Sequence, residues 1–256
     1  MNDRDDTAIG GAEERFPATR HSILAAASSD DPGARRRGFA ALVEGYWKPV
    51  YKYLRLRHRV PGEDAKDLTQ GFFAKAFEKG FFDRFDPSRA SFRTFLRTCL
   101  EGFASNERKA ASRLKRGGDV EMRSLDFEGA EGEIARGGAD PSGDGEALFR
   151  REWVRSLFER AVDALRERCA AAGKDVHFEI FSRYDLDGPD APDGRPRYAD
   201  IAEDLGLTET QVTNHLASAR REFRGLVLEK LREGAGSETE FREDARSIFG
   251  PGDPSR

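Results

Sequence analysis

Side chains that could recognise another molecule by hydrogen bonding are concentrated between Thr208 and Arg221. Hydroxyl and amide groups come first in this stretch, and two adjacent arginines follow them. An amide can bond the edge of adenine at two points, whereas a guanidinium group binds phosphate and sets position without specifying sequence. These residue types therefore suit a surface that reads duplex DNA. The candidates are Thr208, Thr210, Gln211, Thr213, Asn214, Ser218, Arg220 and Arg221.

Two short amphipathic segments would position these side chains. Gly206 suits the left-handed residue that ends a first helix, and Thr208 suits the N-cap of a second. The spacing predicts a helix-turn-helix in which Glu209–Ser218 would enter a major groove. Ordinary helical hairpins have similar spacing, so this stretch alone leaves both interpretations open. The apolar positions that define the two faces are Ile201, Ala202, Leu205, Val212, Leu216 and Ala219.

A second stretch combines aromatic rings with positive charge. Gly80–Ala90 is a predicted loop with three phenylalanines, and Ser91 is the predicted cap of a helix that extends to about Arg116. Its last part, 105–116, carries five basic residues and one acidic residue. Cations bind phosphates and rings stack on unpaired bases, which suits nucleic acid. A basic helix end is also favoured by the helix dipole alone, so a simple solvated end remains an alternative.

The remaining pattern predicts an all-α fold with two small helical domains joined by a flexible acidic linker. No segment has the alternation expected of a strand. The linker holds eight acidic and two basic residues, a net charge of −6. The predicted divisions are a disordered N-terminus (1–18), a first domain (19–116), the linker (117–145), a second domain with the helix-turn-helix (146–234), and a C-terminal tail with a short helix (235–256).

Several classes of protein are disfavoured by composition. Cys99 and Cys169 are isolated and the four histidines are scattered, so neither a disulfide framework nor a metal site is expected. No phosphate-binding loop, nucleophile elbow or paired-histidine zinc motif is present, so we expect neither an enzyme nor a bound cofactor. No apolar run reaches the length of a membrane span, and no export signal is visible. A cytoplasmic protein is the expectation.

Taken together, these segments resemble a bacterial RNA polymerase sigma factor of the extracytoplasmic-function type, within the sigma-70 family. The matching segments follow the family's order: DAKDLTQGFFAKAF (64–77), SFRTFLRTCLEGFASNERKAASRLKR (91–116) and YADIAEDLGLTETQVTNHLASARREFR (198–224). The resemblance covers nearly the whole chain from Thr19. TRHSIL near the N-terminus, SLDFEGAEGE in the linker and the extended C-terminus resemble a planctomycete-type subgroup.

The resemblance implies a protein that binds core RNA polymerase and directs promoter recognition and DNA melting. The first domain would dock on the β′ clamp helices and read the −10 element, and the second would contact the β flap and read the −35 element with the residues named above. An anti-sigma factor or other regulator would be a further partner, and no small-molecule substrate is implied. The implied core-binding residues are Asp64, Asp67, Gln70 and Phe73, and the implied −10 residues are Phe82, Phe85, Asp86, Arg93, Arg97, Arg108 and Lys109.

Some positions depart from the family's pattern or allow another interpretation. Thr213 stands where members often have a basic residue, which leaves the recognition helix nearly uncharged. Phe95 replaces the family's tryptophan in the melting helix, and Gly102 replaces its asparagine. Phe73 could instead fill a helical core. Two other classes remain open: a stand-alone helix-turn-helix regulator, and an adaptor of helical hairpins, including a sigma-like decoy.

Overall fold

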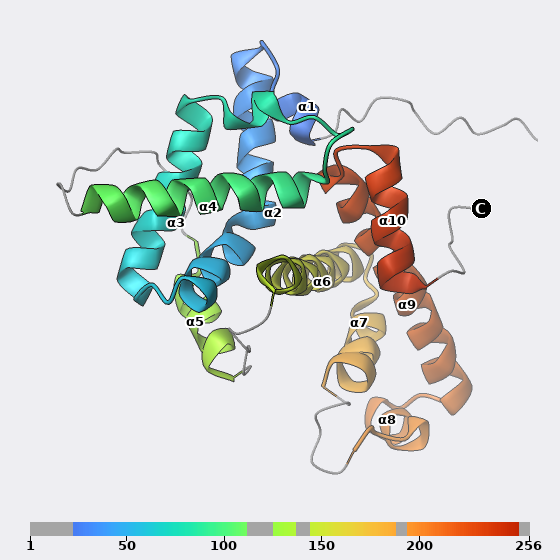
Figure 1. Cartoon of the computed structure of the whole chain (residues 1–256). Helices are drawn as coiled ribbons and strands as arrows, with labels where there is room; N and C mark the ends of the chain where they lie inside the picture. Colours follow the sequence, from blue (N-terminus) through green and yellow to red (C-terminus); the bar gives the residue numbers. More distant parts are fainter. Residues whose placement is uncertain (1–22, 112–124, 137–143, 188–193, 251–256) are drawn as a thin grey trace, which may run out of the picture.

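In this computed structural model, every regular element within the described residues 23–111, 125–136, 144–187 and 194–250 is helical (Figure 1). The prediction of an all-α fold is therefore confirmed for this part of the chain. The predicted disordered segment 1–18 lies outside it. The elements are α1 (Ile23–Ala27), α2 (Pro32–Arg57), α3 (Gly62–Glu78), a 3-10 turn (Phe81–Arg84), α4 (Phe92–Ala111), α5 (Phe127–Arg136), α6 (Gly145–Ala171), α7 (Asp175–Phe181), a π-helical turn (Ser182–Leu186), α8 (Tyr198–Leu205), α9 (Glu209–Gly234) and α10 (Glu238–Phe249).

The start of α2 shows how local capping changes a boundary. The sequence predicts a turn at Asp31–Gly33 and a helix only from Phe39. In the structure the Asp31 carboxylate accepts the backbone N–H groups of Gly33 and Ala34, and Pro32 begins the helix. Both features favour helix initiation, so the expected turn is an N-cap instead. Pro49, where a kink or break is predicted, lies inside one continuous helix.

Aromatic rings fill the space between α2, α3 and α4. Phe73 of α3 meets Phe39 of α2 edge-on, with ring centroids 6.4 Å apart. Its neighbour Phe72 meets Phe103 of α4 at 5.6 Å. Adjacent phenylalanines on one helix point in different directions, and both are buried here because α3 has a helix against each side. Such edge-to-face contacts add to the stabilisation gained from burial.

The predicted flexible linker contains a helix, α5, that packs on α2. The Phe127 ring lies 5.3 Å from Trp47 and 4.9 Å from Tyr51 between centroids, and Ala130 is completely buried. The prediction of a flexible linker is therefore wrong for residues 127–136. The segment is rich in acidic residues and glycines, so its short apolar stripe is not apparent from composition. The helix is stable only when α2 covers this stripe. The other parts of the predicted linker, 117–124 and 137–143, lie outside the described residues.

Carboxylates of α5 bind basic side chains of α2. Glu131 accepts hydrogen bonds from Arg55, and this guanidinium lowers the pKa of the carboxyl group. Glu133 contacts Lys48 and Lys52. Lys52 is only 1% exposed and also reaches Glu152 of α6 at 3.2 Å. A buried ammonium group is costly without partners, so this lysine links α2, α5 and α6.

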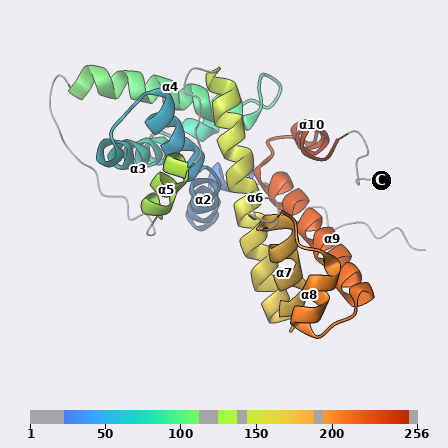
Figure 2. The ribbon, with the colours of Figure 1, turned by 90° about the horizontal axis from the view of Figure 1, so that it is seen from below.

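The long helix α6 joins the two predicted domains. It packs along α2 on one side and along α9 on the other, and it also contacts α4 and α7 (Figure 2). The two predicted helical units are therefore in direct contact. The α6 side chains buried in this contact include Leu148, Phe149, Trp153, Leu157, Ala161 and Leu165.

The C-terminal helices follow the predicted boundaries closely. Gly206 ends α8 with a left-handed φ of 65°. Thr208 caps α9 through the backbone N–H of Gln211, whose side chain in turn accepts the Thr208 N–H. Ser237 caps α10 in the same way, by accepting the N–H of Glu240. No helix in the described part of the chain is long and apolar enough to cross a membrane.

Candidate nucleic-acid interface

The first turns of α9 present several of the predicted duplex-reading side chains to solvent. Thr210, Thr213 and Asn214 are exposed, while Ser218 is half-buried. The Thr213 hydroxyl bonds the Thr210 carbonyl of its own helix at 2.9 Å. Gln211 is exposed as well, but its amide oxygen is used by the Thr208 cap. Of the two amide side chains in this set, Gln211 and Asn214, that of Asn214 therefore makes no hydrogen bond within the described residues.

The two predicted phosphate-binding arginines differ in their surroundings. Arg220 forms a two-point ion pair with Asp185, at 2.7 Å for each bond, and lies over the ring of Tyr184. The hydrogen bond to Asp185 raises the pKa of Arg220. Arg221 is exposed and has no such partner among the described residues. An aspartate after α7 therefore occupies the guanidinium group of Arg220 in this conformation, and its phosphate contact stays a prediction.

The predicted core-binding row on α3 divides into an exposed part and a buried part. Asp64, Asp67 and Gln70 are exposed and recur every three residues, which places them along one side of the helix. Phe73 is 1% exposed and packs against Phe39. In this conformation α2 covers the ring, and the polymerase contact of Phe73 stays a prediction. The alternative, a core residue, is the one observed, because α2 covers that side of α3.

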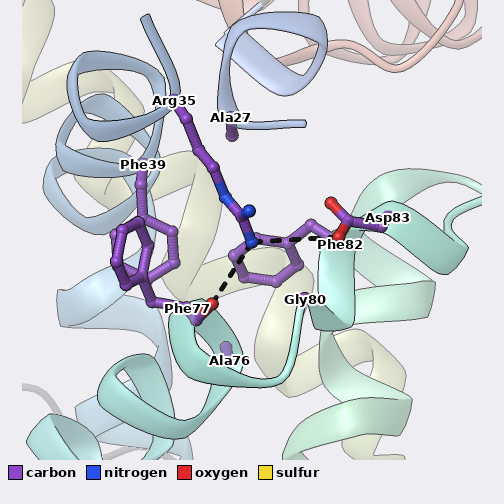
Figure 3. Close-up of a pocket in the computed structure, with 8 residues that line it drawn as sticks. All are labelled: Ala27, Arg35, Phe39, Ala76, Phe77, Gly80, Phe82 and Asp83. Carbon is purple, nitrogen blue, oxygen red and sulfur yellow. Dashed lines mark hydrogen bonds and ion pairs between the residues drawn. The ribbon is translucent and has the colours of Figure 1, made fainter. Parts of the chain in front are cut away.

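The aromatic loop before α4 also packs inward. Phe82 is buried and stacks on Phe39, with centroids 5.7 Å apart (Figure 3). Beside it, the Arg35 guanidinium group points between the Phe77 carbonyl and the Asp83 carboxylate (Figure 3). In this conformation the Phe82 ring belongs to the core, and its contact with a base stays a prediction. The loop contains a short 3-10 turn at Phe81–Arg84, and the Phe82 ring lines a small pocket together with Arg35 and Phe77 (Figure 3).

The second half of this loop is less enclosed. Phe85 is half-buried and meets Phe92 at 5.3 Å and Phe95 at 5.4 Å between centroids. Asp86 is exposed and accepts hydrogen bonds from the backbone and hydroxyl of Ser88, which lower the pKa of its carboxyl group. Of the three predicted −10 residues in this loop, Phe85 and Asp86 thus remain near the surface.

The predicted basic contacts on α4 are mostly engaged within the chain. Arg93 is 8% exposed, forms a two-point ion pair with Asp244 of α10, and lies over the Trp153 ring at 4.2 Å. Arg97 donates to Glu146 of α6 at 2.7 Å. Both guanidinium groups are thus engaged in this conformation, and their contacts with DNA stay predictions. Carboxylates far along the chain neutralise them, and the sequence pattern around α4 contains no sign of that.

Further along α4 the surface opens. Arg108 is exposed, and its only hydrogen bond within the described residues is a long one, of 3.4 Å, to the Ala104 carbonyl of its own helix. The side chain of Lys109 lies outside the described part. Of the basic side chains predicted at the end of α4, that of Arg108 is the one that falls within the described part of the chain.

Residues 42–114 match the family model of sigma-70 region 2. This segment is similar to sigma-70 region 2. It contains most of α2, all of α3 and the aromatic loop, and α4, so the exposed row on α3 and the arginines of α4 all fall within it. The match supports a sigma factor of the sigma-70 family, with a role in DNA binding and in transcription initiation by RNA polymerase. A search of curated proteins and a search of solved structures each found no match.

Two groups of residues in these contacts were missed by sequence reasoning. Glu240 and Asp244 of α10 bind the start of α4, and Glu131 and Glu133 of α5 bind α2. A signal existed for the first pair. Glu240 and Asp244 lie one turn apart and next to Phe241 and Ala245, so a helix that buries its apolar face would also bring these two acids towards its neighbour.

Proposed function

We propose that this chain is a sigma factor of the extracytoplasmic-function type. It binds core RNA polymerase and directs sequence-specific promoter recognition and DNA melting. The observation that carries the proposal is the match of residues 42–114 to sigma-70 region 2, together with the exposed row of Asp64, Asp67 and Gln70 on α3 in that segment. The proposed role is non-enzymatic: the chain supplies specificity, and the polymerase supplies the chemistry.

The α3 row is the proposed contact with the β′ clamp helices of the polymerase. Asp64 and Asp67 supply negative charge, and Gln70 can both donate and accept hydrogen bonds. None of the three forms a hydrogen bond or ion pair within the described residues, so each can bind a partner without first breaking a contact. Phe73 would support this row from beneath by fixing the position of α3.

The helix-turn-helix formed by α8 and α9 is the proposed −35 reader. Its exposed residues Thr210 and Asn214 are suited to base edges, and Arg221 is suited to phosphate. An apolar groove of about 320 Å³ lies behind it, between α6, α7 and α9. We assign this groove to the β flap contact, since it could receive an apolar side chain. It is lined by Phe158, Val162, Phe181, Leu186 and Phe223, with Asp185 and Arg220 at its edge.

In-vitro transcription with purified core polymerase and a pool of genomic promoter fragments tests the proposal. The expected result is transcripts that appear only when this chain is added. An absence of such transcripts would refute the sigma-factor role. A gel shift of the same fragments by the chain alone would favour the stand-alone helix-turn-helix regulator instead.

A further inference from the structure

The C-terminal helix α10 lies against the beginning of α4, although more than 140 residues separate them in the chain. Figure 1 shows α10 beside the end of α4 that follows the aromatic loop. Two features of this contact involve residues implied in −10 recognition, the guanidinium group of Arg93 and the ring of Phe85. A third is the first backbone N–H of α4, that of Phe92, which is the neighbour of Arg93.

Two carboxylates of α10 occupy the positive end of α4. Asp244 binds both terminal nitrogens of Arg93, and Glu240 lies 3.9 Å from one of them. Glu240 also accepts the Phe92 backbone N–H at 3.0 Å. Arg93, Glu240 and Asp244 are each less than 10% exposed. Backbone N–H groups at a helix start and a guanidinium group are the donors that bind phosphate oxygens, so these carboxylates take the place of a phosphate.

The connector before α10 covers the ring of Phe85. Gly236 lies so close that a Cβ atom at this position would be 2.4 Å from the Phe85 Cε1 atom. Its backbone N–H donates to Glu240 at 2.9 Å, which fixes the connector in this position. A base could therefore stack on this part of Phe85 only after the connector moves.

The other side of α10 is attached to α9. Phe241 is buried under Arg232, with the guanidinium carbon 4.1 Å from the ring centroid, and Arg224 lies 4.6 Å from the Phe249 ring centroid. α10 carries four acidic and two basic residues, a net charge of −2. It thus has the charge that single-stranded DNA would bring to Arg93, and it is held close to that site by α9.

We propose that α10 is an intramolecular competitor of single-stranded DNA for the surface formed by Arg93 and Phe85. The inference rests on the proposed function, because it takes this surface to be the one that holds the melted promoter strand. In the closed conformation described above the surface is blocked, and DNA binding requires α10 to leave it. The apparent affinity for DNA is then reduced by the fraction of molecules that are closed.

Fluorescence anisotropy with a short fluorescein-labelled single-stranded DNA of random sequence tests this in the full-length chain. Asp244→Asn removes the negative charge that pairs with Arg93, so α10 should dissociate from α4 more often. Glu243→Gln is the matched control, because Glu243 is on the same helix, is exposed and makes no contact with Arg93. We expect Asp244→Asn to bind at least about tenfold more tightly than wild type, and Glu243→Gln to bind as wild type does.

Gly236→Ala gives an independent variant, because its methyl group would clash with the Phe85 ring and force the ring and the connector apart. It should also bind more tightly, and circular dichroism should show that both variants keep the helical content of wild type. Equal binding by wild type, Asp244→Asn and Gly236→Ala, including no binding by any of them, would overturn the inference. That outcome is compatible with promoter-dependent transcription. Tighter binding by the variants without any transcription would instead refute the proposed function alone.

Discussion

The two surfaces proposed to read DNA differ in how far other parts of the chain cover them. At the start of α4, Arg93 and Arg97 are bound by carboxylates from α10 and α6, and Phe85 is covered by the connector. At the start of α9, Thr210, Thr213 and Asn214 are exposed. Residue types that suit DNA are therefore not sufficient to define an available site. Whether such a site is available to DNA also depends on acidic residues elsewhere in the chain, because they can accept hydrogen bonds from the same donor groups.

The difference also concerns charge. The covered surface has two guanidinium groups, those of Arg93 and Arg97, and a cationic group that loses water needs a counter-charge. The exposed surface on α9 is nearly neutral, and its hydroxyl and amide groups remain hydrated at little cost. Acidic helices α5 and α10 supply the counter-charges for α2 and α4. The acidic residues of this chain thus act inside the molecule as well as at its surface.

The largest expected effect on stability distinguishes a core residue of α3 from a residue of α3 that is proposed to bind the polymerase. Phe73→Ala should lower the free energy of unfolding by about 3–4 kcal/mol, because it removes a ring that is 1% exposed and leaves a cavity. Asp67→Ala should leave that free energy unchanged within about 0.5 kcal/mol, since Asp67 is exposed. Urea denaturation followed by circular dichroism measures both. Equal stabilities would show that Phe73 does not belong to the core.

A reciprocal pair of variants tests the division between core binding and promoter choice. Asp67→Ala should weaken the binding of core polymerase about tenfold, at unchanged promoter choice, because it removes a charge from the exposed α3 row. Asn214→Ala should change −35 choice by about 1–3 kcal/mol per site and leave core binding unchanged, since it removes an amide that reads a base. Core-binding assays and sequencing of selected promoters measure these effects. Similar behaviour of the two variants in the core-binding assay would contradict the division.

The two surfaces also differ in how much of their structure could be predicted from the sequence. The caps at Gly206, Thr208 and Ser237 depend on neighbours within a few residues, so the boundaries of α8 to α10 follow from the sequence. The partner of Arg93 is 151 residues away, and no pattern near Arg93 indicates it. The apolar face of α10 indicates only that Asp244 lies towards some neighbouring helix. The burial of Phe73 depends on the position of α2, which the residues around Phe73 in the sequence do not indicate. Family resemblance gives the role of a position but not its exposure in this chain.

The α5 helix shows a related limit. Its acidic residues and glycines are typical of a linker, and only Phe127, Ala130 and Ile134 form an apolar stripe. Such a short helix is unstable alone, and its stability comes from Trp47, Tyr51 and the basic residues of α2. Sequence composition describes the segment by itself and does not include that surface.

A smaller effect is expected from releasing Arg220. Asp185→Asn should free its guanidinium group to bind a phosphate of duplex DNA, so the slope of log affinity against log salt should become steeper by about 0.9. Asp187→Asn is the control, because it removes the same charge two residues away without a contact to Arg220. Anisotropy with duplex DNA at several salt concentrations measures the slopes. Identical slopes for both variants would indicate that Arg220 does not reach phosphate.

The smallest expected effect concerns pH at the contact between α7 and α9. The rings of His177 and His215 lie 4.3 Å apart between centroids, and burial, then His215, lower the pKa of His177 from 6.5. A lowered pKa in the folded state means that protonation favours unfolding, so stability is complete above pH 6.5 and declines as the pH falls below it. Thermal melts should show a decline of about 1–2 °C by pH 5.5, and His177→Gln should remove part of it. His58, whose pKa is also lowered by burial, contributes to the rest. An equal decline in wild type and variant would assign the whole effect to other groups.

Amide hydrogen exchange tests the contrast between the covered and the exposed surface most directly. Exchange would be measured in the wild-type chain alone and in its complex with core polymerase and single-stranded DNA. We predict that the amides of α10, 238–249, are protected in the free chain and exchange faster in the complex, whereas α9 keeps its protection. Equal protection of α10 in both states, with DNA bound, would contradict the account.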